Sequence, residues 1–149
     1  MPAHKNGALR RSTVLVVNKV VAFITQAERP LVFDHVDFPE AGTQVPAGTL
    51  RENEPPDVGV MREAWEETGL DGLRLLRFLG EYDLRLSESL VHHRFVYHLE
   101  PTGPTPERWL HNELHDGLAK PTKFSFRWVP MSNIPQLFGE KGRLLDRLH

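Results

Sequence analysis

The segment 56–69, PDVGVMREAWEETG, most constrains the fold of this chain, because opposite helix signals stand at its two ends. Pro56 suits a first helical turn, and Asp57 suits the positive end of the helix dipole. Gly69 is a natural left-handed stop after a last helical residue. We therefore predict a helix from Pro56 to about Thr68.

Helical periodicity divides this segment into two sides. At about 100° per residue, the mainly apolar side comprises Val58, Met61, Ala64, Trp65 and Thr68. The carboxylates of Glu63, Glu66 and Glu67 fall on nearly the opposite side, within roughly a 100° arc. We expect Met61 and Trp65 to anchor the helix to a core, and the three carboxylates to project together.

Two interpretations of this acidic side remain open from periodicity alone. Like charges at spacings of three and four residues repel by about a few tenths of a kcal/mol per pair, and Arg62 relieves part of this repulsion. The acidic side is then either a solvated helix surface or a site for a hard cation. Mg²⁺ and Mn²⁺ prefer carboxylate oxygens, and a phosphate substrate would complete their coordination.

Strand-forming residues dominate most of the remaining chain. Runs rich in Val, Ile and aromatic residues predict strands over 13–25, 30–35, 73–86, 90–100, 108–114 and 122–130. We expect a turn or bulge at Asn18–Lys19, a short strand over 44–48, and one or two helices over 132–149. Leu144, Leu145 and Leu148 would form the apolar side of that terminal segment. Many strands with a central and a terminal helix indicate α/β or α+β layers.

Composition limits the class of protein further. The chain has 149 residues, 40% hydrophobic and 26% charged, with a net charge of -2 and no cysteine. A disulfide framework and thiolate chemistry are excluded, and no basic field recruits nucleic acid or an anionic membrane. The apolar runs are too short to span a bilayer. We expect a flexible tail over 1–12, a single domain over 13–149 and a cytoplasmic location.

Residues 48–70, GTLRENEPPDVGVMREAWEETGL, resemble the Nudix box, G-x5-E-x7-R-E-U-x-E-E-x-G-U, where U is aliphatic. The fixed positions are filled by Gly48, Glu54, Arg62, Glu63, Glu66, Glu67 and Gly69. This resemblance implies an α/β/α sandwich with a mixed β-sheet, in which the box forms a loop, a helix and a loop. Segments 44–48 and 127–135 resemble the strand that enters the box and the last strand of such domains.

The resemblance also implies roles for these positions. Glu66 and Glu67 would be ligands of a divalent metal, Mg²⁺ or Mn²⁺, and the carbonyl of Ala47 a further ligand. Glu63 would bind the metal or act as the base on the attacking water. Arg62 would hold Glu63 by a charge-assisted hydrogen bond. Glu54 would brace the loop against the helix, and Gly48 would allow a tight turn.

Residues outside the box are less constrained. Family members often use one further acidic residue as a metal ligand or base; Glu113 is our first candidate, followed by Asp116 and Glu107, each with surface charge as the alternative. Tyr82 and Trp109 are candidates for stacking on a substrate base, worth about 1–3 kcal/mol. Packing in the core is the other interpretation of both aromatics.

The resemblance predicts hydrolysis of the pyrophosphate linkage in a nucleoside diphosphate linked to some group X, by a metal-activated water. The partner would be a nucleotide-derived small molecule. One alternative is a nucleotide-binding sensor without catalysis, and another is removal of damaged nucleoside triphosphates. Removal of an RNA cap expects a basic path, which the net charge of -2 does not favour. Many related enzymes are homodimers, although no interface is recognisable in one sequence.

Overall fold

The computed structural model describes residues 13–113 and 121–148. In chain order, these residues form β1 (Leu15–Gln26), β2 (Arg29–His35), the 3-10 helix η1 (Pro39–Ala41), β3 (Ala47–Thr49), α2 (Pro56–Thr68), β4 (Leu73–Ser87), β5 (Leu90–Pro101), β6 (Arg108–Glu113) and β7 (Thr122–Trp128). Three further 3-10 helices follow: η2 (Met131–Asn133), η3 (Phe138–Glu140) and η4 (Leu145–Leu148). The helix bounds agree with those predicted from Pro56, Asp57 and Gly69, and Gly69 has the expected left-handed φ of 76°.

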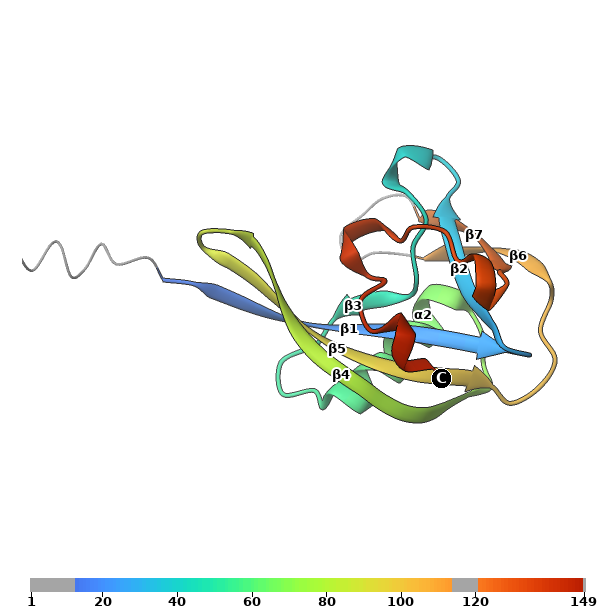
Figure 1. Ribbon diagram of the computed structural model, residues 1–149, viewed down its shortest axis with the longest axis horizontal. Helices are drawn as coiled ribbons and strands as arrows, with labels where there is room; N and C mark the ends of the chain where they lie inside the picture. The colour runs from blue at the N-terminus through green and yellow to red at the C-terminus, as the bar shows by residue number, and fades with distance from the viewer. Residues whose placement is uncertain (1–12, 114–120, 149) are drawn as a thin grey trace, which may run out of the picture.

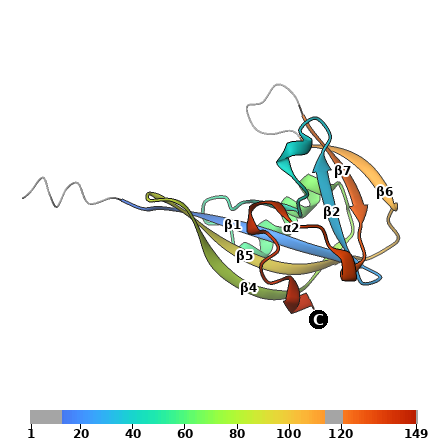
Figure 2. The ribbon, with the colours of Figure 1, turned by 45° about the horizontal axis from the view of Figure 1, so that its top comes forward.

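The strands form one mixed, seven-stranded sheet in the order β4-β5-β1-β2-β7-β6, with β3 paired to β1. β1 and β5 run parallel, and the other pairs are antiparallel. β1 pairs with β2 only at Thr25 and Gln26, and it pairs with β3 at residues 19–21. The sheet therefore opens at β1, and β2, β7 and β6 rise away from β4 and β5 (Figures 1 and 2). β3 pairs with a part of β1 that β2 does not contact. The loop between β3 and α2 therefore begins beside this part of β1.

Alternate residues of β1 contribute to two separate cores. Val20, Ala22 and Ile24 pack on the face covered by α2, together with Val60 and Ala64 of that helix. The intervening Val21 and Phe23 pack on the other face, which the C-terminal segment covers with Leu137 and Leu148 (Figure 2). A strand with both faces covered needs apolar residues at consecutive positions. This layering confirms the predicted α/β architecture with a mixed sheet.

The C-terminal layer differs from the predicted helix. Its described part contains η2, η3 and η4 and no α-helix. Positive φ angles at Gly139 (68°), Glu140 (58°) and Leu144 (73°) interrupt any right-handed helix there. The predicted apolar residues nevertheless pack on the second core, with Leu148 buried and Leu144 and Leu145 against it.

The orientation of α2 corrects the predicted anchoring by Trp65. The buried helix positions are Gly59, Val60, Ala64, Glu67 and Thr68. Trp65 is 53% exposed and Val58 is 54% exposed, so neither anchors the helix, whereas Met61 packs against the core as expected. The helix is rotated relative to the prediction, because the sheet accepts a stripe of small residues and buries one carboxylate with it.

Two further expectations have plain outcomes. β1 continues through Asn18 and Lys19, which pair in register with His93 and Arg94, so the predicted turn or bulge there is wrong. The expectation of a flexible tail over 1–12 lies outside the described residues.

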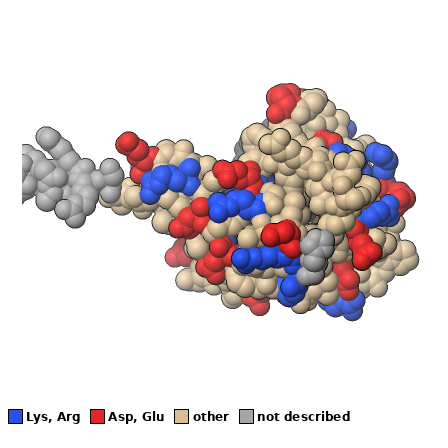
Figure 3. All heavy atoms as spheres, in the orientation of Figure 1, with Lys and Arg blue, Asp and Glu red and all other residues tan. Residues whose placement is uncertain are grey.

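The molecular surface carries mixed charge on the side seen in Figure 3, where acidic and basic side chains are interspersed. Within residues 13–113 and 121–148, no helix has the length and apolar character needed to cross a bilayer. The start of β1 and the β4–β5 hairpin extend together away from the rest of the sheet (Figure 1).

Candidate active site

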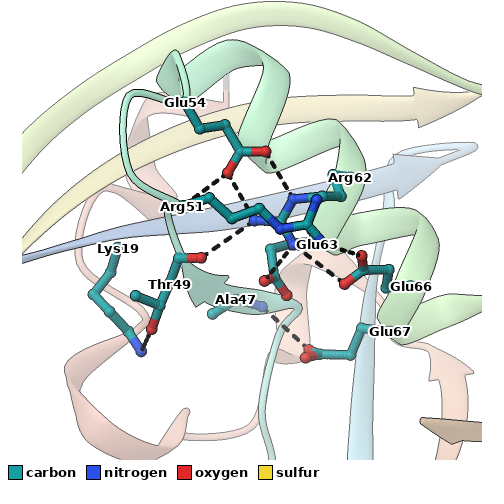
Figure 4. Close-up of polar contacts among 9 residues, drawn as sticks. All are labelled: Lys19, Ala47, Thr49, Arg51, Glu54, Arg62, Glu63, Glu66 and Glu67. Atoms are coloured by element: carbon teal, nitrogen blue, oxygen red, sulfur yellow. Dashed lines mark hydrogen bonds and ion pairs between the residues drawn. The ribbon is translucent and has the colours of Figure 1, made fainter. Parts of the chain in front are cut away.

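Arg62 joins the loop after β3 to the helix that follows it. Its guanidinium donates two hydrogen bonds to the Glu54 carboxylate, from Nε at 2.7 Å and from Nη2 at 2.8 Å. Nη2 also donates to the carbonyl of Thr49 at 3.2 Å. The same guanidinium donates through Nη1 to Glu63 at 2.9 Å and to Glu66 at 3.2 Å (Figure 4). One side chain therefore orients three carboxylates at once.

Glu54 is held firmly in its ionised form. The hydrogen bonds from Arg62, followed by that from the backbone N–H of Arg51 at 3.0 Å, lower the pKa of Glu54 to about 2. The carboxylate thus links both ends of residues 51–62 and stabilises the loop in front of the helix. Glu54 and Arg62, two fixed positions of the box, are thus in direct contact.

Gly48 makes room for Glu63. A β-carbon added to Gly48 would lie 2.0 Å from the carboxyl carbon of Glu63, a separation that real structures do not show. Gly48 was expected to allow a tight turn, but its φ is not positive, and it lies within β3. Glycine is needed at this position because it has no side chain, which allows the Glu63 carboxylate to approach closely. The backbone conformation itself does not require glycine.

Glu67 is the most buried carboxylate of the helix. Its side chain points at the start of β3, where the N–H of Ala47 donates a hydrogen bond of 3.2 Å to Oε1 (Figure 4). Burial, followed by the charge of Glu113, raises the pKa of Glu67 well above its usual value. Because burial disfavours the ionised form of Glu67, a nearby cation would favour its ionisation.

Two hydrogen bonds between α2 and β6 bring Glu113 to this site. Trp109 Nε1 donates to the carbonyl of Thr68 at 2.9 Å, and His111 Nε2 lies 2.9 Å from the carbonyl of Glu66. A carbonyl oxygen only accepts, so His111 donates through Nε2–H. With β6 fixed against the end of α2, Glu113, two residues beyond His111, reaches the carboxylates.

Glu63, Glu66 and Glu113 converge. Each offers a carboxylate oxygen, and these three atoms lie within 4.8 Å of one another. Burial, followed by the charges of Glu63 and Glu66, raises the pKa of Glu113 to about 7. Burial also raises the pKa of Glu63. Glu67, predicted as a metal ligand, is not in this group of three, although it lies beside it on the same helix.

The carboxylates line a cavity of about 940 Å³ between α2, β3 and β6. Its wall also includes Lys19, Trp65, Asp71 and His111. Trp65 was predicted to be core; its indole instead stands at this cavity, with Nε1 donating to Asp71 at 3.0 Å. The spacing of three residues between Arg62 and Trp65 indicates that Trp65 lies on the side of the carboxylate site, since residues i and i+3 share a helix face.

The other sequence candidates lie elsewhere. Trp109 stacks on Phe126 at 5.1 Å, and Tyr82 donates through its hydroxyl to the carbonyl of Glu140 at 3.2 Å; neither lines the cavity. Glu107 forms a surface ion pair with Arg29 at 2.7 Å. Asp116 lies outside the described residues. Of the predicted acidic residues beyond the box, the structure thus brings Glu113 to the carboxylates.

Comparison with known proteins supports the assignment of the fold. The NUDIX domain family matches residues 16–148 of this chain. No curated protein matches the chain by sequence. Among solved structures, a UDP-X diphosphatase superposes with a TM-score of 0.62 at 16% identity, over 99% of this chain and 70% of that one.

Two further solved structures give the same result. A MutT NUDIX hydrolase from Burkholderia pseudomallei has a TM-score of 0.62 at 21% identity, covering 91% of this chain and 99% of its own. An ADP-ribose pyrophosphatase from Streptococcus suis has a TM-score of 0.59 at 14% identity, covering 89% and 92%. With the family match over residues 16–148 and six of the seven fixed box residues lining one cavity, this protein belongs to the NUDIX domain family.

Proposed function

We propose that this protein hydrolyses the pyrophosphate linkage of a nucleoside diphosphate joined to a group X, with Mg²⁺ or Mn²⁺ as its cofactor. The convergence of Glu63, Glu66 and Glu113 within 4.8 Å carries the proposal. The names of the solved structures with this fold agree with it, since they include a UDP-X diphosphatase and an ADP-ribose pyrophosphatase.

The donor set fits a hard divalent cation. The converging atoms are all carboxylate oxygens, which Mg²⁺ and Mn²⁺ prefer. Burial, with a smaller contribution from neighbouring carboxylates, raises the pKa values of Glu63, Glu67 and Glu113. Glu63, Glu66 and Glu113 would hold a cation, with Glu67 and the carbonyl of Ala47 as further ligands. A bound cation would neutralise phosphate charge and lower the pKa of a coordinated water.

The chain's own residues supply the remaining functions. Arg62 keeps Glu63 and Glu66 oriented, which retains the geometry that an in-line attack on phosphorus needs. Glu113 stands among the same carboxylates, where it would serve as a ligand of the cation or as the base on the attacking water. Trp65, exposed at the rim of the cavity, offers an aromatic face on which a base could stack.

The proposed reaction has a direct test. Phosphate release, with added phosphatase, would be measured across nucleotide sugars, ADP-ribose, dinucleoside polyphosphates, coenzyme A and nucleoside di- and triphosphates, in Mg²⁺ and in Mn²⁺. We expect metal-dependent turnover of one class, reduced by about 10²-fold or more in Glu63→Gln and in Glu67→Gln. Glu107→Gln removes one carboxylate on the surface, and it should retain full activity.

Two results would contradict the proposal. Full activity in both Glu63→Gln and Glu67→Gln would remove the carboxylates from the reaction. Tight nucleotide binding without turnover in either metal would favour a sensor that binds nucleotides without catalysis.

A homodimer and a cytoplasmic location stay predictions. Analytical sedimentation would check the first, and cell fractionation the second.

A further inference from the structure

Three cations gather beside the carboxylate cavity, on the sheet face covered by the C-terminal segment. Lys19 on β1 pairs in parallel register with Arg94 on β5, so the two side chains lie on one face. Lys19 Nζ donates to the Thr49 hydroxyl at 2.8 Å, and Lys19 also lines the cavity (Figure 4). Lys19 thus lies both at the carboxylate cavity and on the sheet face that the C-terminal segment covers.

The third cation comes from the C-terminal segment. Arg94 Nη1 donates to the carbonyl of Gly139 at 2.6 Å, which fixes this segment against β5. Two residues later, Lys141 Nζ donates to the side-chain oxygen of Gln44 at 2.9 Å. The charges of Lys19 and Arg94 both contribute to lowering the pKa of Lys141 to about 8, after burial as the main cause. The three cations are therefore close enough to repel one another.

None of these cations has a carboxylate within ion-pair distance in the part of the chain that the structure describes. Arg94 is only 5% exposed, and among the described residues only its Nη1 donates hydrogen bonds, to Gly139 and to the Tyr82 hydroxyl. His92 lies two residues before Arg94 on the same face, and its buried Nδ1 has no hydrogen-bond partner. Grouped cations and an unsatisfied ring nitrogen are costly to keep unless an anion occupies the site.

The nearest balancing charges belong to the candidate metal site. Glu63 and Glu67 act on Lys19, and Glu67 acts on Lys141, through space and without hydrogen bonds. A divalent cation bound to the carboxylates would offset that negative charge. Lys19, Arg94 and Lys141 would then face a further anion, adjacent to the phosphates that the metal holds.

We propose that Lys19, Arg94 and Lys141 form a second anion subsite, which binds a phosphate group of the substrate beyond the pair at the metal. This inference rests on the proposed function and narrows it to substrates with a third phosphate or a phosphorylated X. Lysine and arginine side chains each carry several donors, which suit a phosphate with several acceptor oxygens. A neutral sugar as X would bring no anion to these three cations.

Calorimetric binding of inorganic tripolyphosphate and inorganic pyrophosphate tests the subsite without requiring turnover. Titrations would be made both in EDTA and in excess Mg²⁺, on the full chain. We expect tripolyphosphate to bind more tightly than pyrophosphate, and Lys19→Gln and Lys141→Gln each to weaken it by about tenfold. Lys141→Arg should retain binding, and Arg74→Gln, which removes a surface charge at the far end of β4, should leave it unchanged. Lys variants are used because Arg94 is buried and its loss can unfold the sheet.

Kinetics then separate this inference from the function on which it rests. The expected result is a higher kcat/KM for a substrate with a third phosphate than for a nucleotide sugar, a preference that Lys19→Gln with Lys141→Gln abolishes. In one outcome, the wild type hydrolyses substrates while neither the preference for a third phosphate nor tripolyphosphate binding depends on these lysines. In that case the subsite is refuted and the proposed function stands. If tripolyphosphate binding depends on them while no substrate is hydrolysed, the subsite stands and the hydrolase proposal fails.

Discussion

Gly48 and Glu63 lie so close that a β-carbon on Gly48 would be 2.0 Å from the Glu63 carboxyl carbon. Gly48→Ala should therefore displace Glu63 from Arg62 and from the converging carboxylates. We expect kcat/KM to fall by about 10²-fold, because a displacement of about 1 Å at a reacting group has this effect. Steady-state kinetics would measure it, with Gly103→Ala as control, since no atom lies within 4 Å of a β-carbon there. Equal activity in both variants would contradict the close contact.

Glu54→Gln should destabilise the fold by about 1–3 kcal/mol at pH 7, because its hydrogen bonds to Arg62 are charge-assisted. The pKa of Glu54 is lowered from 4.5 to about 2, so its stabilising contribution is complete above pH 4.5 and is lost as pH falls toward 2. Urea unfolding at several pH values should show the difference from wild type shrinking over this range. Glu107→Gln, which removes an exposed ion pair, should leave stability close to that of the wild type at every pH.

Glu113→Gln should have the opposite pH dependence. Because the folded pKa of Glu113 is raised from 4.5 to about 7, the folded state binds the proton more tightly, and wild-type stability falls as pH rises through this range. In EDTA, the variant should lack this part of the decline, on the order of 1–2 kcal/mol. Unfolding curves at pH 5 and pH 8 would measure the change. An unchanged decline would mean that Glu113 titrates normally.

Trp65→Ala should cost less than about 1 kcal/mol of folding stability, since its side chain is 53% exposed. Helical periodicity predicts Trp65 on the core side, where truncation costs about 3–5 kcal/mol. Leu99→Ala in the core, at 0% exposure, provides the comparison and should cost about 2–5 kcal/mol. Chemical denaturation of the two variants decides between the two orientations of α2.

The turn between β1 and β2 should accept a stabilising replacement. Ala27 and Glu28 have φ angles of 53° and 62°, a left-handed conformation that Asn and Gly adopt at lower cost. Ala27→Asn with Glu28→Gly should raise stability by about 1 kcal/mol, because the left-handed conformation costs most other residues about 1–2 kcal/mol each. A thermal melt would show the increase, and a lower melting temperature would indicate that the two side chains contribute contacts there.

The sequence by itself determined the features that depend on neighbours along the chain. The bounds of α2 followed from Pro56, Asp57 and Gly69, because helix ends are controlled by residues at those positions. The grouping of Glu63 and Glu66 on one side followed from helical spacing, and the box spacing identified the family. Strand positions followed from alternating or continuous apolar runs, within two or three residues.

The tertiary structure alone decided how these elements meet. The burial of Glu67 and the exposure of Trp65 depend on how the sheet receives α2, which no periodicity specifies. Glu113 joins the carboxylates because Trp109 and His111 tie β6 to the end of α2, a contact across 41 and 45 residues. The meeting of Lys19, Arg94 and Lys141 likewise needs parallel pairing of β1 with β5 and the path of the C-terminal segment. Sequence spacing carries local geometry, whereas such encounters depend on packing between distant elements.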